Sequence, residues 1–151
     1  MNLEYLTRSP FQTKKLGEAL AKEVVMVGKG DGARVFGLVG DLGGGKTTFL
    51  QGFAKGLGIK EKVLSPTFVI LKKFEIKKKG PFRFFYHIDC YRTGGDKDLV
   101  ELGFKEIAAD PENIIAAEWA DKAKSLLSKD SIFLNFEFID INTRKIKISV
   151  H

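Results

Sequence analysis

The sequence predicts an α/β fold with a mixed sheet, and three stretches of the chain carry that prediction. An apolar run at 35–39, a glycine-rich turn and an amphipathic segment at 48–57 follow one another in the order strand, turn, helix. Two extended runs, separated by a turn at 77–81, indicate an antiparallel hairpin. A short and fully apolar run at 114–117 suits a buried central strand. We therefore expect parallel and antiparallel neighbours within one sheet.

The composition is that of a soluble globular protein. The 151 residues suffice for one domain spanning 1–151, and 44% of them are hydrophobic while 29% are charged. The net charge of +6, carried mainly by lysine, favours acidic partners such as nucleotides, RNA or an acidic protein surface. The single cysteine excludes an internal disulfide and a cysteine-based zinc site. Without a signal sequence or a long apolar run, we expect a cytoplasmic protein that does not enter a membrane.

The glycine-rich turn matches a phosphate-binding loop. Residues 40–47 read G-D-L-G-G-G-K-T, which satisfies the pattern G-x-x-x-x-G-K-[S/T] between a strand and a helix. Glycines let backbone N–H groups approach phosphate oxygens, and the helix start adds unpaired N–H groups and a positive dipole end. Lys46 would reach the β- and γ-phosphates, and the Thr47 hydroxyl would bind Mg²⁺. These features predict a three-layer fold of the P-loop NTPase type. The expected phosphate contacts are Asp41, Leu42, Gly43, Gly44, Gly45, Lys46, Thr47 and Thr48.

The remaining elements follow from turn signals and hydrophobic spacing. Ser9, Pro10 and Gln12 have the pattern of a capping box at a helix start, where proline suits the first helical position. The apolar face expected for this helix consists of Leu16, Ala19, Leu20, Val24 and Val27. Further strands are expected at 3–6, 69–71, 74–76, 82–89, 132–139 and 145–150, and further helices at 97–102, 104–109 and 120–127.

Two carboxylates stand where a phosphate loop needs an acidic partner for Mg²⁺. Asp89 and Glu118 each come at the end of an apolar strand, and either could bind the metal through its water shell. Alternation along the first strand places His87 and Asp89 on the same face. An acid at a strand end is also often a helix cap or a solvated charge, and the residues alone leave both interpretations open.

Several other residues have a functional and a structural interpretation. Thr67 could sense the γ-phosphate, or it could simply lead into a strand. Trp119 could contact the nucleotide or belong to the core, and Arg92 could contact phosphate or lie on the surface. A lone histidine such as His87 is usually structural. The lysines between 72 and 79 could contact RNA, but such lysines more commonly prevent edge strands from pairing.

Together these motifs resemble the TsaE (YjeE) family of small P-loop ATPases, which bacteria require for the threonylcarbamoyladenosine modification of tRNA. The matching positions span most of the chain: Thr13, Leu16 and Gly17; 40–48 for G-x-L-G-A-G-K-T-T; 65–68 for S-P-T-[F/Y]; 87–92 for H-x-D-L-Y-R; Leu102 and Gly103; Glu118 and Trp119. Two positions depart from the family pattern, with Gly44 in place of alanine and Cys90 in place of leucine. Neither is an expected ligand, so the departures do not argue against activity.

The resemblance implies an ATPase that uses ATP and Mg²⁺. The residues it implies are Lys46, Asp89 and Glu118 for catalysis, Thr47 and Glu118 for the metal, and Thr67 and Trp119 for the nucleotide. Which acid binds the metal and which positions water stays open. ATP rather than GTP follows from the resemblance and from the missing N-K-x-D guanine signature.

The resemblance also implies partners. Hydrolysis by the isolated chain would be weak, and the chain would act on a complex of the proteins TsaB and TsaD, serving tRNA indirectly. Two alternatives belong to other classes of function. A small P-loop kinase would need an acceptor pocket and an arginine-bearing lid, to which five scattered arginines give little support. A non-hydrolysing RNA-binding module would depend on the lysines alone.

Overall fold

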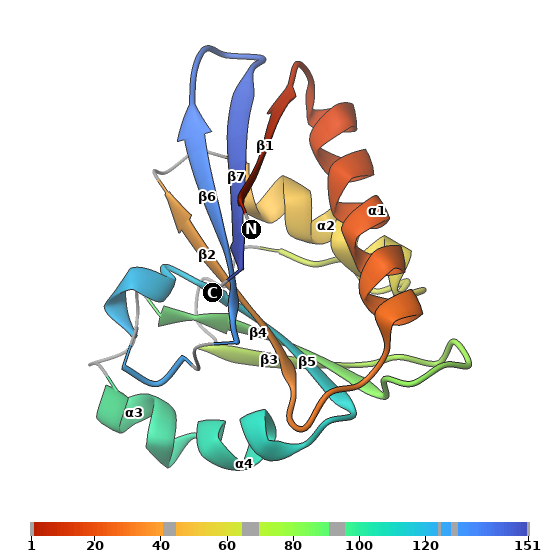
Figure 1. Cartoon of the computed structure of the whole chain (residues 1–151), viewed down its shortest axis with the longest axis vertical. Coiled ribbons are helices and arrows are strands. Elements are labelled where there is room, and N and C mark those ends of the chain that lie inside the picture. Colours follow the sequence, from red (N-terminus) through yellow and green to blue (C-terminus); the bar gives the residue numbers. More distant parts are fainter. Residues whose placement is uncertain are drawn as a thin grey trace.

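The computed structural model describes residues 2–40, 45–64, 70–90, 96–123, 125–127 and 130–150 (Figure 1). Its elements are β1 (Asn2–Thr7), α1 (Pro10–Val27), β2 (Arg34–Gly40), α2 (Lys46–Gly56), β3 (Leu71–Glu75), β4 (Phe84–Asp89), α3 (Asp96–Glu101), α4 (Phe104–Ala109), β5 (Asn113–Glu118), the 3₁₀ helix η2 (Ala120–Lys122), β6 (Ile132–Phe138) and β7 (Arg144–Val150). The prediction of a helix at 120–127 is wrong beyond the first turn, Ala120–Lys122. Ala123 has φ −137° and ψ 28°, outside the helical region, so the helix ends there.

The described strands form one sheet in the order β1-β7-β6-β2-β5-β4-β3. Strands β6, β2, β5 and β4 run parallel, whereas β7, β1 and β3 are joined antiparallel to their neighbours. The sheet is therefore mixed, and the hairpin of β3 and β4 is the predicted one. Strand β5 lies between β2 and β4 and is buried along its whole length, as its apolar run predicts. The carboxyl ends of β2, β5 and β4 meet at one edge of the sheet.

Helices α1 and α2 lie against each other on one face of the sheet (Figure 1). Their backbones touch at Gly17, where an added Cβ atom would lie 2.2 Å from the Phe49 carbonyl oxygen. The buried positions of α1 are Thr13, Gly17, Ala21 and Val24. This corrects the predicted apolar face, because Ala19 and Val27 are exposed. Small side chains are needed where two helix backbones come this close, and hydrophobic spacing alone does not reveal that need.

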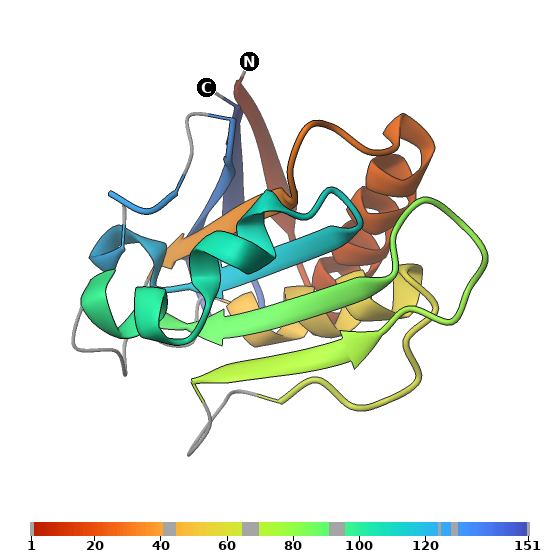
Figure 2. The ribbon, with the colours of Figure 1, turned by 90° about the horizontal axis from the view of Figure 1, so that it is seen from below.

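The two faces of the sheet carry separate apolar clusters. The cluster beneath α1 and α2 is aromatic, and its largest fully buried side chains are Phe36, Phe49, Phe53, Phe85 and Phe136. The cluster on the opposite face includes Leu99 of α3 and Phe104 of α4. Figure 2 shows these two helices on the side of the sheet away from α2. Helices on both faces give the three-layer α/β arrangement that the sequence predicts. Within the described residues, no helix is both long and apolar enough to cross a membrane.

Helix α1 begins at the predicted capping residues. The Ser9 hydroxyl oxygen accepts a hydrogen bond from the backbone N–H of Gln12 at 3.1 Å, and Pro10 occupies the first helical position. The Gln12 side chain reaches one residue further than a capping box requires, since its Oε1 atom accepts from the Arg8 backbone N–H at 2.7 Å. The start of α1 is thereby fixed next to the end of β1.

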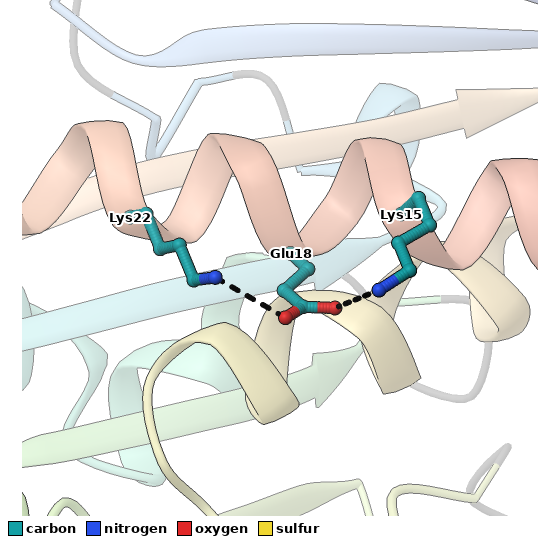
Figure 3. A network of polar contacts seen from close by, with 3 residues as sticks. All are labelled: Lys15, Glu18 and Lys22. Atoms are coloured by element: carbon teal, nitrogen blue, oxygen red, sulfur yellow. Dashed lines mark hydrogen bonds and ion pairs between the residues drawn. The ribbon is translucent and has the colours of Figure 1, made fainter.

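Charge pairs lie along the same helix on the side that approaches α2. Glu18 lies between Lys15 and Lys22, with nitrogen–oxygen distances of 3.6 Å and 3.3 Å (Figure 3). The hydrogen bond from Lys22 lowers the pKa of Glu18 below its ordinary value. Because both lysine side chains are exposed, solvent screens these pairs and they contribute little to folding.

Candidate functional site

The described part of the predicted phosphate loop lies between β2 and α2. Gly45 is the N-cap of α2 and has a φ of 96°, a left-handed conformation that glycine adopts without strain. Gly40 ends β2 with a φ of 141°, and an added Cβ atom would lie 2.2 Å from the Phe136 carbonyl oxygen. The predicted contacts Asp41, Leu42, Gly43 and Gly44 lie outside the described residues. Strand β2 and helix α2 lie on either side of the predicted loop, and the first N–H groups of α2 lack partners within the helix.

Lys46 joins three parts of the fold at the start of α2. Its ammonium group donates a hydrogen bond to the Gly40 carbonyl oxygen at 2.6 Å. The same group lies 4.2 Å from the ring centroid of Trp119, the residue after β5. Only 6% of Lys46 is exposed, so its charge acts in a largely dehydrated environment. Trp119 is therefore next to the predicted phosphate-binding lysine, as its functional interpretation requires.

The two predicted carboxylates are neighbours on adjacent strands. The register of β4 and β5 places Asp89 directly opposite Glu118. On the other side of β5, the register with β2 places Leu38 opposite Glu118. Only 6% of Asp89 and 4% of Glu118 are exposed. Phe85 of β4 packs on Phe53 of α2. Side chains two positions apart on a strand share a face, so His87 and Asp89 also lie on the α2 side of the sheet. Both acids therefore reach the sheet edge at which the phosphate loop begins.

Glu118 has a partner that local sequence does not reveal. His87 Nε2 lies 2.5 Å from Glu118 Oε2, and only 1% of the histidine is exposed. The two residues are 31 positions apart in the chain and meet because β4 and β5 pair in parallel. Sequence reasoning found the shared face of His87 and Asp89, but it did not supply the strand register that brings His87 to Glu118.

A hollow of about 40 Å³ lies beside the start of α2. It is lined by Ser9, Pro10, Thr13, Gly45, Thr48, Ile141, Asn142 and Arg144. The Thr13 hydroxyl shares a hydrogen bond of 2.7 Å with the Thr7 hydroxyl, and Arg144 donates to the Asp140 carbonyl oxygen at 2.6 Å. Nothing in the local sequence pattern marks Asn142 or Arg144, because they meet the phosphate loop only through the pairing of the sheet. Gly45 and Thr48 are the two members that the sequence predicts as phosphate contacts.

A larger cavity of about 530 Å³ lies elsewhere, at the amino end of β2 and beside α4. Its charged lining residues are Asp31, Arg34 and Asp130, and Arg34 donates to the Gly28 carbonyl oxygen at 2.7 Å. Open α/β sheets bind their ligands beyond the carboxyl ends of parallel strands, which is the opposite edge. This cavity is therefore separate from the candidate site.

The residues at the carboxyl edge fit a nucleotide with Mg²⁺. Glu118, Asp89 and Thr47 carry carboxylate and hydroxyl oxygens, and Mg²⁺ prefers oxygen ligands. The described residues contain no cluster of three or more histidine, cysteine or acidic side chains that could hold a metal by themselves. Mg²⁺ in nucleotide sites needs no such cluster, since one or two carboxylates act together with substrate phosphates. The predicted contacts of Thr67 and Arg92 lie outside the described residues.

Comparison with known proteins identifies the family. The model of the family described as "Threonylcarbamoyl adenosine biosynthesis protein TsaE" matches residues 7–146. A protein named tRNA threonylcarbamoyladenosine biosynthesis protein TsaE from Borreliella burgdorferi is 40% identical over 107 residues, which cover 70% of this chain and 74% of that protein. Its namesake from Aquifex aeolicus is 33% identical over 147 residues, covering 96% and 94%. The crystal structure of YdiB from Bacillus subtilis matches with a TM-score of 0.77 and 29% identity, over 99% of this chain and 86% of that chain. The chain belongs to the TsaE family.

Proposed function

We propose that the chain is a Mg²⁺-dependent ATPase that acts on a complex of TsaB and TsaD during the formation of threonylcarbamoyladenosine in tRNA. A role in that biosynthesis is the role of the family. One observation carries the ATPase part of the proposal. Lys46, at the start of α2, contacts the Gly40 carbonyl oxygen and the Trp119 ring, and two buried acids, Asp89 and Glu118, stand at the carboxyl ends of β4 and β5. A nucleoside triphosphate needs a cation and helix amides for its phosphates, and carboxylates for its metal.

The phosphates would be held by backbone and lysine together. The N–H groups of 43–46 and the Thr48 hydroxyl would donate to phosphate oxygens, and the dipole of α2 would favour the negative charge. Lys46 would neutralise the charge that develops between the β- and γ-phosphates as their bond breaks. A dehydrated ammonium group performs this task better than an exposed one, because its electrostatic attraction is less screened.

The acids would divide the remaining work. Thr47 and Glu118 would hold Mg²⁺, Glu118 directly or through water, and the metal would supply charge neutralisation at the phosphates. Asp89, opposite Glu118, would orient or deprotonate the attacking water. Thr67 would report the γ-phosphate to the rest of the chain, and Trp119 would contact the nucleotide beside Lys46.

The hollow beside α2, at about 40 Å³ too small for a whole nucleoside, would line one side of it. Thr48 lies both in this hollow and next to the expected metal ligand Thr47, so a nucleotide extending away from the phosphates enters the space between α1 and the β6–β7 hairpin. Asn142 offers an amide group and Arg144 a planar cation, groups that hydrogen-bond and stack on a base.

The decisive experiment measures ATP hydrolysis by the chain alone and with TsaB and TsaD. We expect weak hydrolysis that the partners stimulate. Asp89→Asn should lower the stimulated rate at least about 100-fold, the usual effect of removing a group that activates water. Glu118→Gln should weaken binding of ATP with Mg²⁺. Glu106→Gln, an exposed acid on α4, is the matched control and should leave the rate unchanged.

Two results would contradict different parts of the proposal. If the partners change neither the rate nor the assembly of their complex, the action on TsaB and TsaD is wrong. If neither Asp89→Asn nor Glu118→Gln alters hydrolysis or binding, the acids are not part of the site. Transfer of labelled γ-phosphate to a small acceptor would instead identify a kinase.

A further inference from the structure

We propose that His87 is a positioning residue that fixes the Glu118 carboxylate for Mg²⁺ binding, an inference that rests on the proposed function. His87 Nε2 lies 2.5 Å from Glu118 Oε2, and only 1% of His87 and 4% of Glu118 are exposed. A carboxylate that binds Mg²⁺ is ionised and only accepts hydrogen bonds, so in that state the ring donates from Nε2. The contact holds one of the two carboxylate oxygens in a defined place.

Stability alone does not account for this pair. Apart from Asp89 at the end of β4, the same face of β4 and β5 is apolar, since Phe85, Ile114 and Ala116 belong to the aromatic cluster beneath α2. Taking a carboxylate and an imidazole out of water costs free energy that their contact at best offsets. An apolar pair would stabilise this face equally well. The polar pair is therefore best explained by what Glu118 does at the sheet edge.

The strand register shows how the ring reaches the acid. His87 lies opposite Ala116, two positions before Glu118, and the small alanine leaves room for the imidazole to extend toward the carboxylate. Glutamate has several rotatable bonds, and a hydrogen bond from a buried ring restricts them. In the described part of the chain, Glu118 Oε1 makes no hydrogen bond, so one oxygen is held by His87 while the other is left for a ligand.

Residues that hydrogen-bond to metal-binding side chains orient them, and their loss typically weakens metal affinity by about 10- to 100-fold. His87 would therefore govern the part of ATP affinity that depends on Mg²⁺. Metal-free ATP, which depends on Lys46 and the helix amides, would bind independently of it. This separation distinguishes positioning from a general effect on folding.

The test measures ATP affinity by calorimetry in Mg²⁺ and in EDTA, with thermal unfolding to check the fold. His87→Leu and His87→Asn remove a donor at the Nε2 position, whereas the amide of His87→Gln restores one. In His87→Leu and His87→Asn, we expect the ratio of ATP affinity in Mg²⁺ to ATP affinity in EDTA to be about 10-fold smaller than in wild type. Their affinity in EDTA should stay within about 2-fold of wild type. His87→Gln should recover most of the gain. Tyr86→Phe, on the opposite face of β4, is the matched control.

A double variant completes the test. If His87 acts through Glu118, then His87→Leu should have no further effect in a Glu118→Gln chain, which carries no carboxylate at position 118 to be positioned. The inference is wrong if His87→Asn keeps the full Mg²⁺-dependent gain, or if His87→Gln loses as much as His87→Leu. If the wild type binds no ATP in either buffer, the proposed function is wrong as well. If the wild type binds ATP with and without Mg²⁺, only the inference about His87 is wrong.

Discussion

Lys46 and Trp119 form a residue-scale contact that ties the phosphate loop to the end of β5. The ammonium group lies 4.2 Å from the indole centroid, within the range of a cation–π interaction. Trp119 has a φ of 57°, a left-handed conformation that costs a non-glycine residue about 1–2 kcal/mol. Strain of this kind is typical of functional sites, where the surrounding structure holds a residue in place for its task. The environment of the indole therefore depends on the position of the Lys46 ammonium group.

This arrangement predicts an intrinsic fluorescence signal. Trp119 is the single tryptophan of the chain, so its emission can be assigned without ambiguity. Binding of ATP should draw Lys46 toward phosphate and change the emission, because the charge nearest to the indole moves. Titration of the protein with ATP and Mg²⁺, followed at the tryptophan emission, measures the effect.

Lysine variants provide the controls for that titration. Lys46→Ala should abolish both nucleotide binding and the emission change, since it removes the phosphate-binding cation. Lys55→Ala, in the last turn of the same helix and exposed, should retain both. Retention of ATP affinity by Lys46→Ala would show that the loop does not bind nucleotide as proposed.

At this scale the sequence predicts residues better than it predicts contacts. Lys46, Asp89 and Glu118 can be singled out because a motif or a strand end marks each one. The contact of His87 with Glu118 depends on how two strands align, and no local pattern encodes that alignment. Trp119 is predictable as a neighbour of Glu118, but its position over Lys46 follows from a left-handed turn after β5.

At the scale of elements, the close approach of α1 and α2 places the helix that follows the phosphate loop. An added Cβ atom on Gly52 of α2 would lie 1.9 Å from the Lys14 carbonyl oxygen of α1. Hydrophobic spacing predicted that α1 exists, and the capping residues predicted where it begins. It could not predict the contact surface, because the deciding residues are glycines, which carry no hydrophobic signal.

Gly52→Ala should destabilise the fold by at least about 2 kcal/mol. Alanine favours a helix over glycine by about 1 kcal/mol, but the methyl group would force two helix backbones apart, and the second effect dominates. Urea unfolding measures the change. The matched control is Gly80→Ala, where the nearest atom to an added Cβ is 3.8 Å away, and its stability should differ little from wild type. If Gly52→Ala and Gly80→Ala had equal free energies of unfolding, the close contact of α1 and α2 at Gly52 would not contribute to stability.

At the scale of the whole molecule, Cys90 couples folding to alkaline pH. It belongs to the cluster beneath α3 and α4, and burial, reinforced by the charge of Asp89, raises the pKa of its thiol from 9.0 to about 12. In the unfolded chain the thiol ionises near its ordinary pKa, whereas in the folded chain it stays protonated. The contribution of this group to stability is therefore constant below pH 9 and is lost as the pH rises from 9 toward 12.

The expected result is a pH-dependent difference between wild type and Cys90→Ala. The free energy of unfolding of wild type should fall relative to the variant by up to about 1.4 kcal/mol per pH unit above pH 9. Urea unfolding of both proteins at pH 7.5 and pH 10.5 measures it, and the titration of lysines cancels in the comparison. A difference that is the same at both pH values would mean that the thiol ionises equally easily in both states.

The hollow beside α2 also constrains when the protein can become functional during its synthesis. Its walls combine Ser9 and Thr13 with Asn142 and Arg144, which are synthesised much later. The chain between them must be folded or held in a compact state before these walls can meet, because β1 pairs with β7 across almost the whole sequence. A ribosome-bound chain that stops before residue 142 would therefore carry the phosphate loop without the opposite wall of the hollow. Under the proposed function, such a chain should bind nucleotide more weakly than a chain that includes β7.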